Sequence, residues 1–106
     1  LLTNVKIVPS LPHNELLDIM LESKLIISDS GGLQEEGTFF NKKVIVCRDV
    51  TERPEAIITG HLHLCHTPEE LPKLFGSLVN NYYINTKCPY GEGDTCKQIN
   101  ELLKII

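Results

Sequence analysis

Residues 25–36 read Leu-Ile-Ile-Ser-Asp-Ser-Gly-Gly-Leu-Gln-Glu-Glu, and the rest of the chain can be interpreted outward from them. The first three residues form a short, apolar, β-prone run that predicts a buried strand. Leu33, Gly37 and Phe40 follow at helical spacing and predict a helix. The stretch therefore predicts a strand, a tight glycine turn and a helix in direct succession.

The start of that helix has the features of an anion site. Ser30 suits the N-cap, and Gly31 and Gly32 would let a ligand approach the backbone closely. A helix N-terminus presents unpaired N–H groups and the positive end of the helix dipole, so we expect it to bind a phosphate. Glu36 lies on the same helix face as Gly32 and should point back at the turn, where a carboxylate suits ribose hydroxyls. A capped helix with a tight turn and no ligand would use the same residues, so the turn alone leaves both interpretations open.

Short apolar runs alternate with amphipathic segments along the whole chain. Strands separated by helices favour a parallel sheet with right-handed crossovers. The expected fold class is α/β, a Rossmann-like parallel sheet of about four strands with flanking helices. The strands are expected at 5–8, 25–28, 44–47 and 61–65, and the helices at 14–22, 31–40, 54–59, from a capping box at 67–70 to 79, and 94–106.

Ligands of an open parallel sheet bind beyond the carboxyl ends of its strands. The loops at that edge are predicted at 9–13, 28–32, 48–53 and 66–67. We therefore expect the functional site on this edge.

Composition excludes several classes of protein. A chain of 106 residues is one domain at most, and its net charge of −4 argues against nucleic acid as a partner. No apolar run approaches membrane length, no signal-peptide pattern opens the chain, and the absence of an initiator Met suits a fragment. The four cysteines have no C-x-x-C spacing, which favours free thiols in a reducing cytoplasm. Cys47 lies in an apolar run and is predicted to be a buried thiol.

A metal site is one interpretation of residues 61–66, where His61, His63 and Cys65 would share one face of a strand. Zinc requires four ligands in a tetrahedron, and a flat strand rarely supplies three of them. We therefore expect histidines on a partly exposed strand face, and no metal.

The loop at 48–53 is densely charged. Arg48 and Arg53 flank it, with Asp49, Glu52 and Glu55 between or beside them. A local salt-bridge cluster is the interpretation that the residues alone favour. The alternative is a charged lip in which an arginine presents its forked donors to a pyrophosphate.

Three segments carry a resemblance to a known family. Residues 28–36, then Arg-Asp-Val-Thr-Glu-Arg-Pro-Glu at 48–55, then Pro-Tyr-Gly-Glu-Gly at 89–93, resemble in this order the C-terminal part of the non-hydrolysing UDP-N-acetylglucosamine 2-epimerases. The resemblance covers nearly the whole chain. It implies a glycosyltransferase-B-like fold, in which two Rossmann-like domains enclose the active site. Residues 1–106 would then be a single, incomplete C-terminal nucleotide-sugar-binding domain that lacks its opening strands and the entire first domain.

The resemblance also implies an activity and a set of site residues. The family interconverts UDP-N-acetylglucosamine and UDP-N-acetylmannosamine by eliminating UDP to give a glycal and adding it back, with no metal or other cofactor. The phosphate would be bound by Ser30, Gly31 and Gly32, the ribose by Glu36, and Arg53 would both bind UDP and act as a catalytic residue in the cleft. Most acid and base carboxylates belong to the first domain, so the chain alone is expected to be inactive. The implied partners are a UDP-sugar, the N-terminal domain of the same enzyme and a second copy of the protein in a homodimer. The enzyme would be cytoplasmic and would act in polysaccharide biosynthesis.

Three alternatives remain open at this point. A glycosyltransferase of the same fold would use a similar UDP-binding half, although the Thr-Glu-Arg-Pro-Glu match argues against it. A second alternative is an epimerase that acts on a modified UDP-hexosamine. It is suggested by residues 37–40, because many relatives of the family have Ala-Pro after the two glutamates. This departure should affect helix packing more than ligand contacts. A non-catalytic nucleotide-sensing module is the third.

Overall fold

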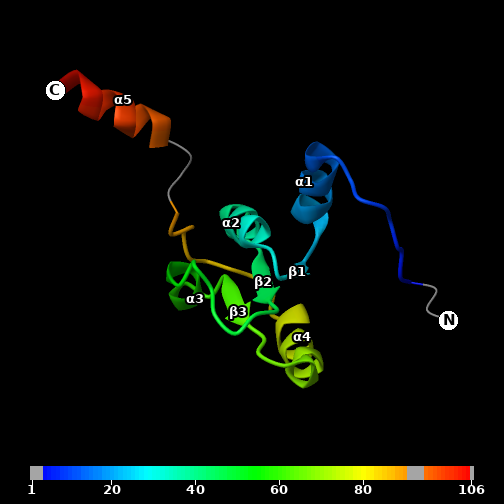
Figure 1. The fold of residues 1–106 in the computed structure, drawn as a ribbon. Coiled ribbons are helices and arrows are strands. Elements are labelled where there is room, and N and C mark those ends of the chain that lie inside the picture. The colour runs from blue at the N-terminus through cyan, green and yellow to red at the C-terminus, as the bar shows by residue number, and fades with distance from the viewer. Residues whose placement is uncertain (1–3, 91–94, 106) are drawn as a thin grey trace.

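A central three-stranded sheet organises the computed structural model, which describes residues 4–90 and 95–105 (Figure 1). The strands are β1 (Leu25–Ser28), β2 (Lys43–Val46) and β3 (Leu62–Leu64). The helices are α1 (His13–Glu22), α2 (Gly31–Phe39), α3 (Glu55–Ile58), α4 (Leu71–Val79) and α5 (Thr95–Ile105), with a short 3-10 helix, η1 (Pro68–Glu70), before α4. None of the helices in these described ranges has the length and apolar character needed to cross a bilayer.

The sheet is parallel throughout, with the strands in the order β1-β2-β3. Leu25 is paired with Lys43 and Ser28 with Val46, and β3 continues the same parallel register on the far side of β2. Every residue of β2 is buried because a strand and a helix layer cover it on each side. The predicted α/β class with a parallel sheet and flanking helices is confirmed.

The prediction of a fourth strand at 5–8 is wrong for the described residues. This segment is not paired with the sheet, and Val5 and Ile7 are 57% and 93% exposed. In Figure 1 it leaves α1 and extends away from the strands. An apolar β-prone run becomes a strand only when a neighbouring backbone pairs with it, and no described segment does so here.

Side chains of β2 point alternately to two separate cores. Val44 and Val46 pack with Ala56 of α3 and Leu62 of β3. Ile45 faces the other way and packs with Cys65 and with the apolar side of α4 around Leu78. The sheet is thus covered by α2 and α3 on one face and by α4 on the other.

Helix α2 lies very close to the sheet because residue 37 is a glycine. A Cβ atom added to Gly37 would lie 2.7 Å from Val44 Cγ2 and 3.2 Å from Ile26 Cδ1. The next residue, Thr38, is also fully buried and donates a hydrogen bond to the carbonyl of Gln34 at 2.7 Å. Both residues therefore lie on the buried side of α2.

Two helix-end predictions have different outcomes. Gly60 has a φ of +85° and ends α3 in the left-handed conformation, as predicted for a C-terminal glycine. The capping box at 67–70 is wrong, because the Thr67 side chain makes no capping bond. The Glu70 carboxylate instead accepts a hydrogen bond from the backbone N–H of His66, one residue before the expected donor.

Burial of the cysteines and histidines differs from the prediction. Cys47, the residue after β2, is exposed, whereas Cys65 is buried because it packs with Ile45 and Leu78 in the core beneath α4. His61 is fully buried instead of lying on a partly exposed face. Its Nδ1 lies 2.6 Å from Thr59 Oγ1 and its Nε2 lies 3.2 Å from Asn41 Oδ1. Within the described residues, no three His, Cys, Asp or Glu side chains are arranged to hold a metal.

The buried histidines predict a loss of stability in acid. Burial lowers the pKa of His61, and burial lowers that of His63 despite its hydrogen bond to the Gly60 carbonyl. The folded protein therefore favours the neutral histidines. Their stabilising contribution to folding is fully present above the unfolded pKa of about 6.5. It is lost as the pH falls further, because the unfolded chain takes up protons more readily than the folded protein does. We expect urea midpoints to fall between pH 7.5 and pH 5, and His61→Gln to flatten this dependence. An equal pH dependence in the variant would contradict this role for His61.

Candidate nucleotide-binding site

The turn between β1 and α2 forms a capped helix start at the carboxyl edge of the sheet. Ser30 is the N-cap, and its Oγ accepts a hydrogen bond from the backbone N–H of Leu33 at 3.3 Å. Ser28 Oγ in turn accepts from the Ser30 N–H at 3.0 Å and holds the turn in place. The predicted N-cap is confirmed, and α2 begins at Gly31.

The backbone of this turn is open. A Cβ atom added to Gly31 would meet nothing within 4 Å, and one added to Gly32 would lie 3.8 Å from Ser30 Oγ and 4.0 Å from Glu36 Oε1. The first N–H groups of a helix have no partner within the helix, so this open backbone presents free donors. The position of Glu36 Oε1 also places its carboxylate next to the turn, as the tilt of helical side chains predicts.

His13 is a neighbour of this site that the sequence did not reveal. Its Nε2 lies 3.0 Å from Glu36 Oε2, while the His13 side chain is 67% exposed and that of Glu36 only 29%. His13 is the first residue of α1, and the loop before it was among those predicted at the carboxyl edge. That shared edge was the available signal, since nothing in the local sequence links the two residues.

The two arginines of the 48–53 loop have different partners. Arg48 donates to both carboxylate oxygens of Glu52, at 3.0 and 2.9 Å, in an exposed pair within the loop. A backbone hydrogen bond and then Arg48 lower the pKa of Glu52. Arg53 instead reaches α2, where its Nε forms an ion pair with Glu35 Oε1. The salt-bridge interpretation therefore holds for Arg48, while Arg53 is held beside the helix that follows the turn.

A chain of hydrogen bonds from Gln34 through Thr51 to Arg53 and Tyr90, called the relay below, fixes the backbone of Arg53. Gln34 is fully buried, and its Oε1 accepts a hydrogen bond from Thr51 Oγ1 at 2.5 Å. Thr51 Oγ1 in turn accepts from the Arg53 N–H at 3.0 Å, and the Arg53 carbonyl accepts from the hydroxyl of Tyr90 at 3.3 Å. Burial raises the pKa of Tyr90 to about 12, so it remains a donor at neutral pH.

This relay joins the three segments that carried the family resemblance. The first contributes Gln34 and Glu35, the second Thr51 and Arg53, and the third Tyr90. Residues 91–93 of the third segment lie outside the described residues. Segments far apart in the sequence thus meet beside the start of α2, which is where the sequence placed the site.

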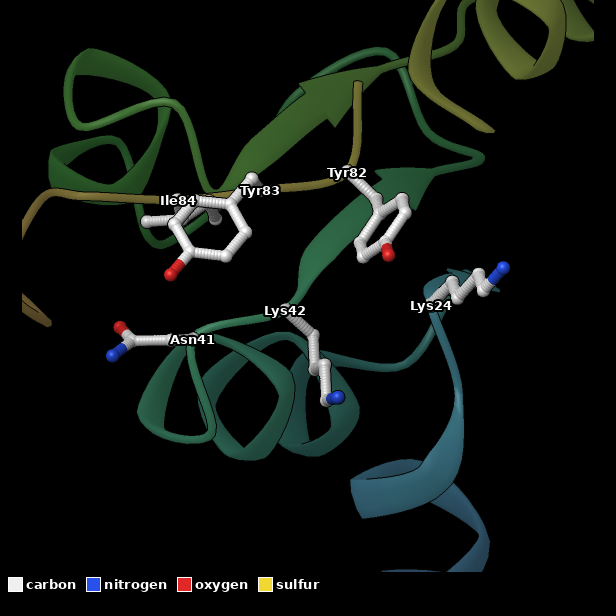
Figure 2. Close-up of a pocket in the computed structure, with 6 residues that line it drawn as sticks. All are labelled: Lys24, Asn41, Lys42, Tyr82, Tyr83 and Ile84. Carbon is white, nitrogen blue, oxygen red and sulfur yellow. The ribbon is translucent and has the colours of Figure 1, made fainter. Parts of the chain in front are cut away.

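A pocket lies at the opposite end of the strands and is lined by none of the predicted site residues (Figure 2). It has a volume of about 290 Å³. Lys24 precedes β1 and Lys42 precedes β2, so the pocket is at the amino ends of the strands. Figure 2 shows Tyr82 and Tyr83 extending from a neighbouring segment toward this edge, and the Lys24 ammonium lies 5.4 Å from the centre of the Tyr82 ring.

Comparison with known proteins gives a consistent result. A family profile described as UDP-N-acetylglucosamine 2-epimerase matches residues 1–104. The UDP-N-acetylglucosamine 2-epimerase of Escherichia coli K12 is 41% identical over 93 residues, which cover 81% of this chain and 24% of that protein. The chain thus spans about a quarter of the length of the relatives that it matches.

Solved structures agree with the sequence matches. The UDP-GlcNAc 2-epimerase of Methanocaldococcus jannaschii superposes with a TM-score of 0.84 at 32% identity, covering 98% of this chain and 29% of that one. The enzyme from Neisseria meningitidis, solved bound to UDP-GlcNAc, superposes with a TM-score of 0.79 at 38% identity, covering 92% and 28%. The fold is therefore that of a part of these glycosyltransferase-B-like proteins.

Proposed function

This chain belongs to the UDP-N-acetylglucosamine 2-epimerase family, and from that premise we propose that it is the UDP-binding part of such an enzyme. The whole protein would interconvert UDP-N-acetylglucosamine and UDP-N-acetylmannosamine. The observation that carries the proposal is the set of groups around the N-terminus of α2. An open backbone with free N–H donors has the Glu36 carboxylate beside it, and the relay holds Arg53 alongside the same helix.

Each of these groups matches one part of UDP. The N–H groups at Gly31 and Gly32, with the Ser30 hydroxyl, suit a phosphate oxygen at the positive end of the helix dipole. The Glu36 carboxylate can accept hydrogen bonds from both ribose hydroxyls, and its contact with His13 restricts where it points. Arg53 supplies forked donors and a fixed positive charge for the diphosphate.

The proposed chemistry requires tight control of UDP. A base removes the proton at carbon 2 of the sugar, the bond from carbon 1 to the phosphate oxygen breaks, and UDP leaves with added negative charge. Arg53 and the N-terminus of α2 would stabilise that charge, which is the catalytic role proposed for Arg53. Glu36 would keep UDP in place while the glycal is protonated on its other face and UDP adds back.

The remaining parts of the enzyme are proposals from the family. An N-terminal domain would supply the acid and base carboxylates and grip the sugar, and the enzyme would act as a cytoplasmic homodimer without a cofactor. The N. meningitidis relative is described as bound to UDP-GlcNAc, which supports this substrate. A product assay separates the alternatives, because an epimerase interconverts UDP-sugars whereas a glycosyltransferase releases UDP and transfers the sugar.

The ribose assignment is tested by Glu36→Gln in the full-length protein. The variant keeps the shape of the side chain but loses its charge and one acceptor, and charge-assisted hydrogen bonds contribute about 1.5–3 kcal/mol each. We expect UDP affinity, measured by calorimetry, to fall about tenfold or more, at ~1.4 kcal/mol per decade. The wild type should also prefer UDP over 2′-deoxy-UDP, and the variant should lose most of that preference.

Glu35→Gln is the matched control on the adjacent residue. Glu35 points about 100° around the helix from Glu36, so it lies away from the proposed ribose site. Its ion pair with Arg53 gives it only an indirect link to UDP, so this variant should weaken UDP binding less. It should also keep the preference for UDP over the 2′-deoxy analogue. Equal discrimination by wild type and Glu36→Gln would show that Glu36 does not bind the ribose.

A further inference from the structure

Two cysteines face each other where β2 and β3 end. Val46 is paired with Leu64 in the parallel register, so the next residues along each strand, Cys47 and Cys65, are opposite one another. The ladder continues to this point, because the Cys65 N–H donates to the Val46 carbonyl at 2.7 Å. Facing residues of neighbouring strands point to the same side of the sheet and lie about 4.8 Å apart. That spacing is within the range of about 4.4–6.8 Å between the Cα atoms of disulfide-bonded cysteines.

The surroundings make the pair reachable from solvent. Both cysteines line a cavity of about 320 Å³ together with His66, Thr67, Pro68 and Leu71. Cys47 is exposed, whereas Cys65 is 5% exposed and its thiol donates to the Thr67 carbonyl at 3.1 Å. Burial and then the neighbouring Cys47 raise the pKa of the Cys65 thiol. The two thiols are therefore unequal, and Cys47 is the one that a reagent in solution meets first.

We propose that Cys47 and Cys65 are a redox modification site that forms a reversible intrachain disulfide. The oxidant is a low-molecular-weight disulfide of the glutathione class. The Cys47 thiolate attacks one sulfur of this disulfide, which gives a mixed disulfide and releases one small thiolate. The Cys65 thiolate then attacks the Cys47 sulfur and releases the second small thiolate. The protein loses two hydrogens and the small disulfide is reduced to two thiols.

The inference does not depend on the proposed function. It uses the register of two strands and the unequal exposure of two thiols, and neither belongs to the UDP contacts. Its location nevertheless matters, because Cys47 is the residue directly before the 48–53 loop that carries Thr51 and Arg53. A disulfide would tie the start of that loop to the end of β3.

The test is oxidation of the full-length protein with glutathione disulfide, followed by alkylation and peptide mass mapping. We expect a linked pair of peptides containing Cys47 and Cys65, the loss of two alkylatable thiols, and full recovery of both thiols after dithiothreitol. A wild-type protein that carries only glutathione adducts, or that links Cys47 to Cys88 or Cys96, would overturn the proposal.

Single variants test the order of the two steps. Cys65→Ser should stop at a glutathione adduct on Cys47, because the resolving thiol is absent. Cys47→Ser should lose the disulfide and leave Cys65 largely unmodified. Cys96→Ser removes an exposed thiol of α5 and is the matched control, so it should form the Cys47–Cys65 link as the wild type does. Circular dichroism of each variant checks folding, and loss of the link in Cys96→Ser would contradict the assignment.

Discussion

Gly37→Leu is expected to lower the free energy of unfolding by about 2–3 kcal/mol, since overpacking a well-filled core typically costs about 1–3 kcal/mol. The new side chain would begin 2.7 Å from Val44 Cγ2 and 3.2 Å from Ile26 Cδ1. Val44 is fully buried in the central strand, and a β-branched side chain has few alternative rotamers. The helix must therefore move away from the sheet, and chemical denaturation with urea measures the cost.

Gly76→Leu is the matched control in α4. A Cβ atom at Gly76 meets nothing within 4 Å, and leucine is a better helix former than glycine by roughly 0.8 kcal/mol. This variant should therefore keep or slightly raise the free energy of unfolding. If the two variants behave alike, close packing of α2 on the sheet is not what residue 37 provides.

Arg53→Ala is expected to lower UDP affinity about 100-fold in the full-length protein. Hydrogen bonds to charged groups contribute about 1.5–3 kcal/mol, and ~2.7 kcal/mol corresponds to a factor of 100. The loop should keep its conformation in this variant, because Thr51 and Tyr90 bind only the backbone of residue 53. The loss of affinity would then report the guanidinium group itself, and calorimetry with UDP measures it.

Arg48→Ala is the control within the same loop. Its guanidinium is already bound by both oxygens of Glu52 in an exposed pair, which contributes little. UDP affinity should change less than twofold. Arg53→Lys should recover part of the affinity, because it keeps the charge but not the fork. If Arg48→Ala weakens UDP more than Arg53→Ala does, the two roles have been assigned the wrong way round.

Local patterns in the sequence determined the order of helices and strands from α1 to α5. Strands and helices differ in apolar period, and that difference can be read within a few residues. Helix ends were predicted where a single residue satisfies the backbone. Ser30 caps α2 through its own hydroxyl. Gly60 adopts a positive φ, a backbone conformation that is strained in residues with a Cβ atom. The three segments of the family resemblance also gave the candidate site, because the resemblance assigns roles to individual residues.

Tertiary structure decided everything that depends on a distant partner. Residues 5–8 have the pattern of a strand but no paired neighbour among the described residues. Cys47 and Cys65 lie in similar apolar runs, yet the end of β2 exposes the first and α4 buries the second. Pairing and burial are set by what packs against a residue, and that information is not in its own segment.

The contacts around the site also depend on partners that the local sequence does not specify. Tyr90 binds the backbone of Arg53 from 37 residues away, Thr51 binds Gln34 from 17 residues away, and His13 reaches Glu36 from another helix. Each is a short-range interaction between groups that only the completed sheet brings together at one edge. The sequence therefore determined the groups suited to a phosphate and a ribose, whereas the fold decided which residues hold them in position.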